Sequence, residues 1–198
     1  MTKELLLIFV KHPIPGQVKT RLAATMGNEG AVAIYQQLLA YSCEISKEIT
    51  ANKAVFYGNQ IPETDLWKKA GYQRFLQEGE DLGARMLQAF VWGFDQGYER
   101  ILIMGSDCPH LNSSHLKEAF SQLQSHDVVL GPAKDGGYYA LGLSKLFPAL
   151  FSQKAWSTPS VFTATLQDLM RSGKSFYLLP TLSDVDHEED LKGTFLES

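Results

Sequence analysis

The sequence predicts a single α/β domain whose central sheet is mostly parallel and is covered by helices on both faces. Three observations lead to this fold class. Short apolar runs of strand length recur along the chain and alternate with segments of helical period. The first run, Leu5–Val10, is apolar at every position, which is typical of a strand buried in a parallel sheet. No linker, repeat or low-complexity tract interrupts the 198 residues, so one domain is expected over 1–198.

The alternation consists of seven runs of strand length and four segments of helical period. The expected strands are Leu5–Val10, Ala54–Tyr57, Gln73–Gln77, Ile101–Met104, Val128–Leu130, Tyr138–Leu143 and Phe176–Leu179. The expected helices are Glu29–Ile49, Asp81–Gln96, Asn112–Gln124 and Pro159–Arg171. Ligands of such sheets bind beyond the carboxyl ends of the strands, so the segments that follow strands are the first candidates for function.

Each predicted helix carries a start signal or an apolar face. Asn28 is a good N-cap for the first helix, and Asn112 opens an Asn-Ser-Ser capping set for the third. Pro159 stands near the first turn of the fourth, where proline is tolerated. The second helix places one set of residues on a single face: Leu82, Met86, Ala89, Phe90 and Gly93.

The loop after the first strand gathers positive charge. It reads KHPIPGQVKTRL and brings Lys11, Lys19 and Arg21 close to Gly16. Free backbone N–H groups and cationic side chains before a helix can hold an anion. The two prolines limit the freedom of the loop, so less entropy is lost when a ligand orders it. The pattern favours a phosphate-binding loop over an ordinary connection with surface lysines.

A second informative segment, RILIMGSDCPHL, follows a predicted central strand. It places Asp107 at the carboxyl end of Ile101–Met104, facing the cationic loop. A carboxylate there would repel a phosphate unless a cation stood between them, so a bridging Mg²⁺ or Mn²⁺ ion is expected. The alternative is that Asp107 caps the helix near Asn112 or stabilises the local turn. Cys108 is expected to be a packed small residue, because no base is assigned to activate it.

The segment GPAKDGGYYALGL joins two predicted strands. Gly136 and Gly137 allow a tight turn and Asp135 can bond its own backbone, so a simple hairpin explains the motif. The functional interpretation is that the glycines let a second substrate approach, with Asp135 as a base or hydroxyl acceptor. Tyr138 and Tyr139 point to opposite faces of an extended strand, so only one of them can line a pocket.

Acidic residues surround His187 near the end of the chain, in LSDVDHEEDL. Asp186 follows the last predicted strand and is placed to join Asp107 as a second carboxylate on one metal. The alternative is an acidic turn before a final helix, with Glu188 and Glu189 suited to a helix N-terminus. A zinc site is not expected, because no second histidine lies at ligand spacing.

Composition argues against several classes of function. The formal net charge of −4 disfavours electrostatic binding of nucleic acid. No apolar run reaches the length of a bilayer span, and the apolar start lacks a small-residue cleavage site, so it is interpreted as a strand. Two cysteines without a CxxC pair predict a cytoplasmic location. The oligomeric state is left open, because the aromatic residues suit a core as well as an interface.

Nearly the whole chain is covered by six motifs: KHPIPGQVKTRL, QEGEDLGARM, MGSDCPHL, GPAKDGGYYALGL, KAWST and DVDHEEDL. In this order they resemble the bacterial family DUF2064, also called selenodomain-associated transferase 1. Its members are similar to nucleotide-diphospho-sugar transferases of the GT-A fold. The resemblance implies a three-layer α/β/α domain of GT-A type and a transferase that uses a nucleotide-activated donor, with Mg²⁺ or Mn²⁺ as cofactor.

The resemblance also nominates site residues one by one. For the nucleotide phosphates it implies Lys11, Gly16, Lys19, Thr20 and Arg21. For the nucleobase it implies Gln77, Leu82 and Gly83. Arg85 either adds to this set or pairs with Asp81. For the acceptor it implies the DGGYY and KAWST segments, with Asp135 as base: Gly136, Gly137, Tyr138 and Trp156.

For the metal, Asp107 matches the aspartate of the superfamily in the short form G-S-D, and Asp186 matches its second carboxylate. Related enzymes carry D-x-D-T-x-E-D-L near their ends. This chain has His187 where threonine is usual, and Asp184 is a rival ligand. The choice between Asp184 and Asp186 therefore stays open at this point.

Three functions are carried forward. The resemblance favours a glycosyltransferase that moves a sugar from a nucleotide sugar to a small-molecule acceptor, with the metal stabilising the diphosphate. The loop KTRL is also similar to the K-x-R-L loop of phospholactate guanylyltransferases, in which a nucleoside triphosphate loses pyrophosphate. The absence of an L-A-G-G-x-G-x-R-M opening weighs against a standard nucleotidyltransferase. A non-catalytic nucleotide-binding module is disfavoured, because the charged residues of the motifs are all present.

Overall fold

The computed structural model describes residues 3–197. Its strands are Glu4–Val10 (β1), Asn52–Tyr57 (β2), Gln73–Leu76 (β3), Arg100–Met104 (β4), Val128–Pro132 (β5), Tyr138–Leu143 (β6) and Phe176–Leu178 (β7). Its helices are Thr20–Lys47 (α1), Leu66–Lys69 (α2), Leu82–Asp95 (α3), Ser113–Gln122 (α4) and Val161–Ser172 (α5). Pro148–Phe151 (η1) and Glu188–Leu191 (η2) are 3₁₀ turns.

All the named strands form one sheet in the order β3-β2-β1-β4-β6-β5-β7. The pairs β3–β2, β2–β1, β1–β4 and β5–β7 are parallel, whereas β6 runs antiparallel to both β4 and β5. The predicted hairpin between β5 and β6 is therefore present. The prediction of a mostly parallel sheet is confirmed.

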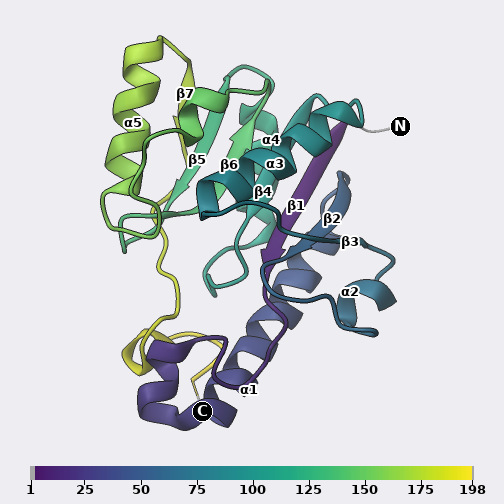
Figure 1. Cartoon of the computed structure of the whole chain (residues 1–198), viewed down its shortest axis with the longest axis vertical. Coiled ribbons are helices and arrows are strands. Elements are labelled where there is room, and N and C mark those ends of the chain that lie inside the picture. Colours follow the sequence, from purple (N-terminus) through teal and green to yellow (C-terminus); the bar gives the residue numbers. More distant parts are fainter. Residues whose placement is uncertain (1–2, 198) are drawn as a thin grey trace.

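Helices cover both faces of this sheet, as Figure 1 shows. Along β1, Leu6 and Ile8 enter an apolar cluster with residues of α1 and α4. Leu5 and Leu7 enter a second cluster with residues of α3 and α5. Because successive side chains of a strand point to opposite faces, one apolar run supplies both cores. The three-layer α/β/α prediction is confirmed.

The first helix differs from its prediction at the N-terminal end. α1 begins at Thr20 rather than at Glu29, and it contains a break at Gly27, where φ is 74° and ψ is 165°. Leu22 is fully buried, so the additional turns pack into the core instead of lying in a loop. The capping signal at Asn28 therefore coincides with the break inside the helix, and the true start lies beside the cationic loop.

The other helix starts agree more closely with their predictions. The Asn112 carboxamide oxygen accepts hydrogen bonds from the backbone N–H groups two and three residues further on. Asp81 caps α3 in the same manner. Pro159 lies just before α5 rather than in its first turn, and α2 was not predicted. Within residues 3–197, none of the helices is long and apolar enough to cross a membrane.

Residues 179–197 leave the sheet and run back to the start of α1 (Figure 1). Two backbone hydrogen bonds guide this C-terminal segment. The Lys134 N–H donates to the Leu182 carbonyl over 2.9 Å, and the Val185 N–H donates to the Asp107 carbonyl over 3.0 Å. The acidic residues near the end of the chain are thereby held against the loop that follows β4.

Candidate nucleotide and metal site

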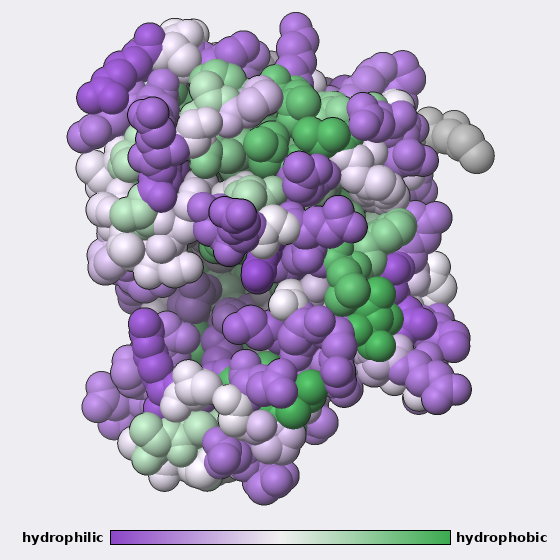
Figure 2. Space-filling model, in the orientation of Figure 1, coloured by the Kyte–Doolittle hydropathy of each residue, from purple (hydrophilic) through white to green (hydrophobic). Residues whose placement is uncertain are grey.

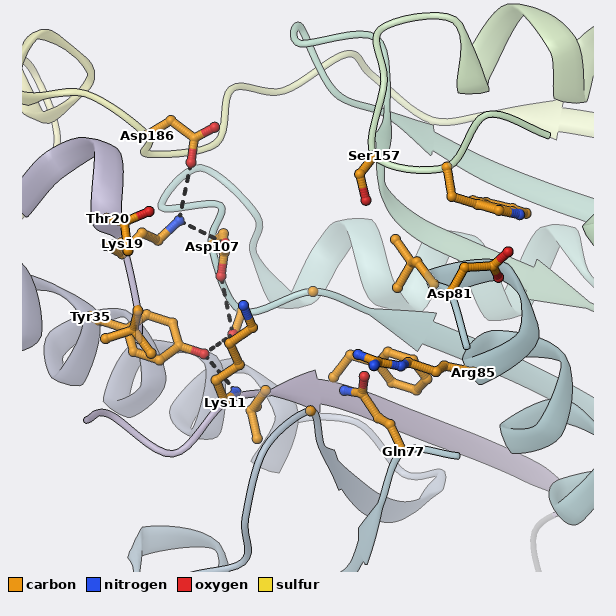
Figure 3. A pocket seen from close by; sticks show the side chains of 18 of the residues that line it. Lys11, Lys19, Thr20, Tyr35, Gln77, Asp81, Arg85, Asp107, Ser157 and Asp186 are labelled. Atoms are coloured by element: carbon orange, nitrogen blue, oxygen red, sulfur yellow. Dashed lines mark hydrogen bonds and ion pairs between the residues drawn. The ribbon is translucent and has the colours of Figure 1, made fainter. Parts of the chain in front are cut away.

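A cavity of about 740 Å³ opens beyond the carboxyl ends of β1 and β4 (Figure 3). In Figure 2 a recess rimmed mostly by hydrophilic side chains separates the body of the sheet from the lobe formed by the start of α1 and the C-terminal segment. Predicted site residues on the cavity wall are Lys11, Lys19, Thr20, Arg21, Gln77, Leu82, Asp107, Trp156 and Asp186. The cavity lies where α/β sheets bind their ligands.

Lys19 joins three separate parts of the chain within this cavity. Its ammonium donates to Asp107 Oδ2 over 2.7 Å and to the Val185 carbonyl over 2.7 Å, and it lies 3.6 Å from Asp186 Oδ1 (Figure 3). The side chain is only 5% exposed. Lys19 also has a left-handed backbone, with φ of 47° and ψ of 46°, immediately before α1. The cationic loop and the two predicted metal carboxylates are therefore in direct contact.

Neither of these carboxylates is used as a helix cap. Asn112 caps α4, whereas Asp107 accepts from Lys19 and from the Ser106 hydroxyl, which lies 3.3 Å away. In the C-terminal segment, it is the Asp190 carboxylate that accepts from the N–H groups of Asp186 and of the next residue. The alternative that Asp107 caps α4 is therefore wrong. The alternative for the C-terminal segment is present in the structure, because Glu188 and Glu189 lie in the first turn of η2. The metal role of Asp186 stays a prediction.

The two remaining cations of the loop lie on the open side of the cavity. Arg21 Nη1 lies 3.0 Å from Asp186 Oδ2, and its side chain is 67% exposed. Lys11 extends its side chain into the cavity, while its backbone N–H donates to the Tyr35 hydroxyl over 2.9 Å (Figure 3). Both side chains are available to an anionic ligand.

Several carboxylates lie close to the Lys19 ammonium. Burial together with the charges of Asp107, Asp135 and Asp186 raises the pKa of Asp184 to about 7, against a smaller opposing effect of Lys19. Burial alone would lower the pKa of the Lys19 ammonium, but Asp107 and the neighbouring carboxylates raise it above its ordinary value. Lys19 is therefore a charged residue whose partners are nearby carboxylates.

Asp184 and Asp186 differ in whether they are accessible from the cavity. Asp186 lines the cavity, whereas Asp184 does not. Asp107 and Asp186 direct one oxygen each toward the same ammonium, and their side chains are 44% and 35% exposed. Across residues 3–197, no group of three His, Cys, Asp or Glu side chains is arranged to hold a metal. Two partly exposed carboxylates nonetheless fit Mg²⁺ or Mn²⁺, which take further ligands from water and phosphate.

The opposite end of the cavity is formed by the segment before α3. The Gln77 amide donates from Nε2 to the Phe56 carbonyl over 2.9 Å, which leaves its oxygen on the cavity side (Figure 3). Arg85 also lines the cavity and donates from Nε to the Gly79 carbonyl, while Asp81 caps α3. The cavity wall here combines these polar groups with the half-exposed Leu82.

Gly83 has a different position from that of its neighbours. A Cβ atom built on it would lie 2.1 Å from Cε2 of Trp156, so the indole rests directly on the glycine. Trp156 in turn stacks on Phe151, with ring centroids 6.4 Å apart. The absence of a side chain at Gly83 therefore leaves room for the Trp156 indole, and Trp156 rather than Gly83 lines the cavity. The segments assigned to nucleobase and acceptor meet at this contact.

Several predicted residues lie outside the cavity wall. Asp135 Oδ1 accepts from the Gly137 N–H over 2.9 Å, as in the hairpin interpretation. A Cβ on Gly136 would lie 2.1 Å from the Pro159 carbonyl oxygen, and φ there is 89°. Tyr138 packs against the apolar cluster beneath α5. Their predicted acceptor roles stay predictions, since the hairpin alone accounts for their positions. Gly16, with φ of 76°, likewise forms a turn beside the cavity.

Tyr35 and Ser106 belong to the site and were not predicted. Both line the cavity, and their hydroxyl oxygens lie 3.2 Å apart. Tyr35 stands on the buried face of α1 among apolar residues. A buried tyrosine usually finds a partner for its hydroxyl, so this position on an apolar face was the available signal.

We expect Tyr35→Phe to lower the free energy of unfolding by about 1–2 kcal/mol, because the Lys11 N–H and the Ser106 hydroxyl lose a buried partner. It should also weaken binding of inorganic pyrophosphate, since Lys11 is no longer held at the cavity edge. Urea denaturation and pyrophosphate titration measure the two effects. Tyr41→Phe, the same change on the same helix outside the cavity, serves as control. Equal effects of both substitutions would contradict this role of Tyr35.

Cys108 follows Asp107 but takes no part in the cavity wall. Its thiol is buried and donates to the Ser183 carbonyl over 3.4 Å. Burial, assisted by the charge of Asp184, raises the pKa of Cys108 to about 12. A thiol with such a pKa is a poor nucleophile at neutral pH. Cys108 therefore packs the C-terminal segment against the loop after β4.

Comparison with known proteins gives one family match. A family model described as "Uncharacterized protein conserved in bacteria (DUF2064)" matches residues 40–158. A crystal structure from Desulfovibrio desulfuricans G20, described as a candidate nucleotide-diphospho-sugar transferase, is 30% identical to this chain. It superposes with a TM-score of 0.88 over 100% of this chain and 93% of the other.

Two further proteins are more distant. The 2-phospho-L-lactate guanylyltransferase of Methanocaldococcus infernus is 26% identical over 120 residues, which are 59% of this chain and 54% of that protein. The match thus spans about half of that relative's length. A manganese complex of Rv0371c from Mycobacterium tuberculosis H37Rv is 12% identical, with a TM-score of 0.55 over 96% of this chain and 97% of the other. This last likeness shows the fold alone. The fold is that of the nucleotide-diphospho-sugar transferases.

Proposed function

This chain belongs to the DUF2064 family of bacterial proteins, and on that premise we propose that it is a metal-dependent transferase acting on a nucleotide-activated donor. The transferred group is a sugar, the donor is a nucleoside diphosphate sugar, and the acceptor is a small molecule. One observation carries the proposal: the Lys19 ammonium, the Asp107 carboxylate and the Asp186 carboxylate meet at the wall of one cavity.

The cationic residues hold the diphosphate. Lys11 and Arg21 stand on the open side of the cavity, where they neutralise phosphate oxygens and fix the position of the donor. Lys19 lines the same cavity and contacts both carboxylates, while Arg21 contacts Asp186. Positioned charge of this kind stabilises a leaving diphosphate more than a ground-state substrate, because negative charge develops on the leaving group.

Asp107 and Asp186 are the residues that would hold the Mg²⁺ or Mn²⁺ ion. When bound, such an ion supplies Lewis-acid stabilisation to the diphosphate. Rv0371c, which has the same fold, forms a complex with manganese, and this is in keeping with the proposed metal. The nucleobase lies at the other end of the cavity, beside Gln77 and Leu82.

The acceptor approaches from the side of Trp156, which forms the wall next to the base end. We propose Asp135 as the base for the acceptor hydroxyl, because it is a carboxylate on the loop between β5 and β6, close to Asp184 of the C-terminal segment. Gly136, Gly137 and Tyr138 form the hairpin that carries Asp135. We place the reaction in the cytoplasm, because Cys43 and Cys108 are both unpaired thiols.

Nucleotidyl transfer is the second candidate, and a specific observation favours it. Lys19 and Arg21 belong to the KTRL segment, and the Methanocaldococcus infernus relative is a guanylyltransferase. In that reaction a phosphorylated acceptor attacks the α-phosphate of a nucleoside triphosphate, and pyrophosphate leaves. The same cationic loop and carboxylates would serve both reactions.

A product assay separates the two candidates. The protein is incubated with Mn²⁺, a panel of nucleotide sugars, GTP, CTP and UTP, and a mixture of small hydroxylated and phosphorylated acceptors. We expect release of a nucleoside diphosphate from a nucleotide sugar. Release of pyrophosphate from a triphosphate would favour nucleotidyl transfer instead. Thermal stabilisation by a nucleotide without turnover of any donor would contradict both and indicate a binding module.

A further inference from the structure

The Lys19 ammonium lies where a divalent ion would have to bind. It contacts Asp107 Oδ2 at 2.7 Å and Asp186 Oδ1 at 3.6 Å, the two carboxylates assigned to the metal (Figure 3). The Val185 carbonyl accepts a third contact at 2.7 Å. These oxygens are hard ligands, and an ammonium satisfies them by hydrogen bonding and charge. One ammonium and one divalent ion cannot occupy the same position between them.

Several features hold the ammonium in place. The side chain is 5% exposed, so most of its length is packed rather than free to sample solvent. The left-handed backbone of Lys19, with φ of 47°, is unfavourable for a residue with a Cβ atom, so surrounding contacts must maintain it. The C-terminal segment is bound to the loop after β4 by the Val185–Asp107 backbone hydrogen bond, which keeps both carboxylates near the ammonium.

Removal of the Lys19 ammonium would leave two negatively charged carboxylates close together. Asp107 and Asp186 would face each other, with the exposed Arg21 beside Asp186. Carboxylates grouped in this way attract the nearest available cation. In the metal-free protein that cation is Lys19.

We propose that Lys19 is an internal counter-ion that competes with free divalent metal for Asp107 and Asp186, so that the metal enters together with the phosphates of the nucleotide. The inference rests on the proposed function. Lys19 lines the same cavity as Lys11 and Arg21, so a diphosphate held by these two residues would also offer oxygens to the Lys19 ammonium. Once the ammonium turns to the phosphate, the two carboxylates are free for the metal. The consequence is cooperative binding of metal and diphosphate.

The test compares Mn²⁺ binding by wild type, Lys19→Met and Lys11→Met, measured by calorimetric titration with MnCl₂ alone. Both variants lose one positive charge from the same cavity, but only Lys19 contacts the carboxylates. We expect Lys19→Met to bind Mn²⁺ on the order of tenfold more tightly than wild type, because a competing cation is gone. Lys11→Met should raise the Mn²⁺ affinity much less, because no contact joins the Lys11 ammonium to either carboxylate among the described residues. Lys19→Met combined with Asp107→Asn should lose the gain.

A second measurement on the wild-type protein keeps the inference testable if Lys19→Met fails to fold. Thermal unfolding is followed with Mn²⁺, with inorganic pyrophosphate, and with both. We expect the midpoint to rise with both ligands by more than the sum of the separate rises. Lys19→Met, where folded, should bind Mn²⁺ more tightly but pyrophosphate more weakly. These opposite changes separate a counter-ion from a purely structural lysine.

The outcomes also separate this inference from the proposed function. If wild type shows the combined stabilisation but Lys19→Met binds Mn²⁺ no more tightly, the counter-ion role is wrong and metal dependence stands. If wild type binds Mn²⁺ alone as tightly as Lys19→Met does, the competition is likewise refuted. If no variant responds to Mn²⁺ with or without pyrophosphate, both the inference and the metal-dependent function fail.

Discussion

Asp107→Asn should reduce the rate of group transfer by about a hundredfold or more. The substitution keeps the size of the side chain but removes the negative charge that lies 2.7 Å from the Lys19 ammonium at the cavity wall. A neutral amide is a weaker ligand for Mg²⁺ or Mn²⁺ than a carboxylate. The stabilisation of the leaving diphosphate is then largely lost. Steady-state kinetics with the donor identified by the product assay would measure this effect.

A matched control is Asp95→Asn, the same chemical change at an exposed position of α3 outside the cavity. It should leave both turnover and nucleotide binding near wild-type values. Circular dichroism of Asp107→Asn would show whether its fold is kept. Wild-type affinity of Asp107→Asn for the metal–nucleotide complex, together with wild-type turnover, would refute the assignment of Asp107 to the metal.

Gly83→Ala is expected to destabilise the protein by about 1–3 kcal/mol and to weaken donor binding. The new methyl carbon would lie 2.1 Å from the Trp156 indole, so either the ring or the start of α3 has to move. Displacement of Trp156 changes the wall of the cavity between the base end and the proposed acceptor side. Urea denaturation gives the change in stability, and titration with the identified nucleotide gives the change in affinity.

A double-mutant cycle shows whether Trp156 is the cause. In a Trp156→Ala background the clash is absent, and alanine is a better helix residue than glycine by about 1 kcal/mol. Gly83→Ala should then be neutral or stabilising. If the destabilisation by Gly83→Ala is the same in both backgrounds, Trp156 is not what the glycine accommodates.

Much of the fold could be predicted from local patterns. The run Leu5–Val10 is apolar at every position, and the structure buries it on both faces of the sheet. The Asn112 cap was readable because its hydrogen bonds span only two to three residues. The start of α1 could not be predicted from such a local pattern. Burial of Leu22 against the core extends the helix past the break at Gly27, and that contact depends on residues far away in the sequence.

The candidate site was predictable in its components rather than in its contacts. Asp107, Lys19 and Arg21 were expected at the carboxyl edge of the sheet, and all three line the cavity. That Lys19 itself stands between the two carboxylates could not be foreseen. Tyr35 was missed because a helix position gives no sign of the backbone group that its hydroxyl will meet.

By itself, the sequence determined the order of strands and helices, the mostly parallel three-layer fold and the set of charged groups available for chemistry. Those features depend on periodicity and capping, which act over a few residues. Only the tertiary structure decided which groups meet: Lys19 with Asp107 across 88 positions, and Lys19 with Val185 across 166. It likewise decided that Gly83 carries Trp156. Such pairings are set when the strands align at one edge of the sheet and the C-terminal segment folds back over it, and no local pattern encodes that arrangement.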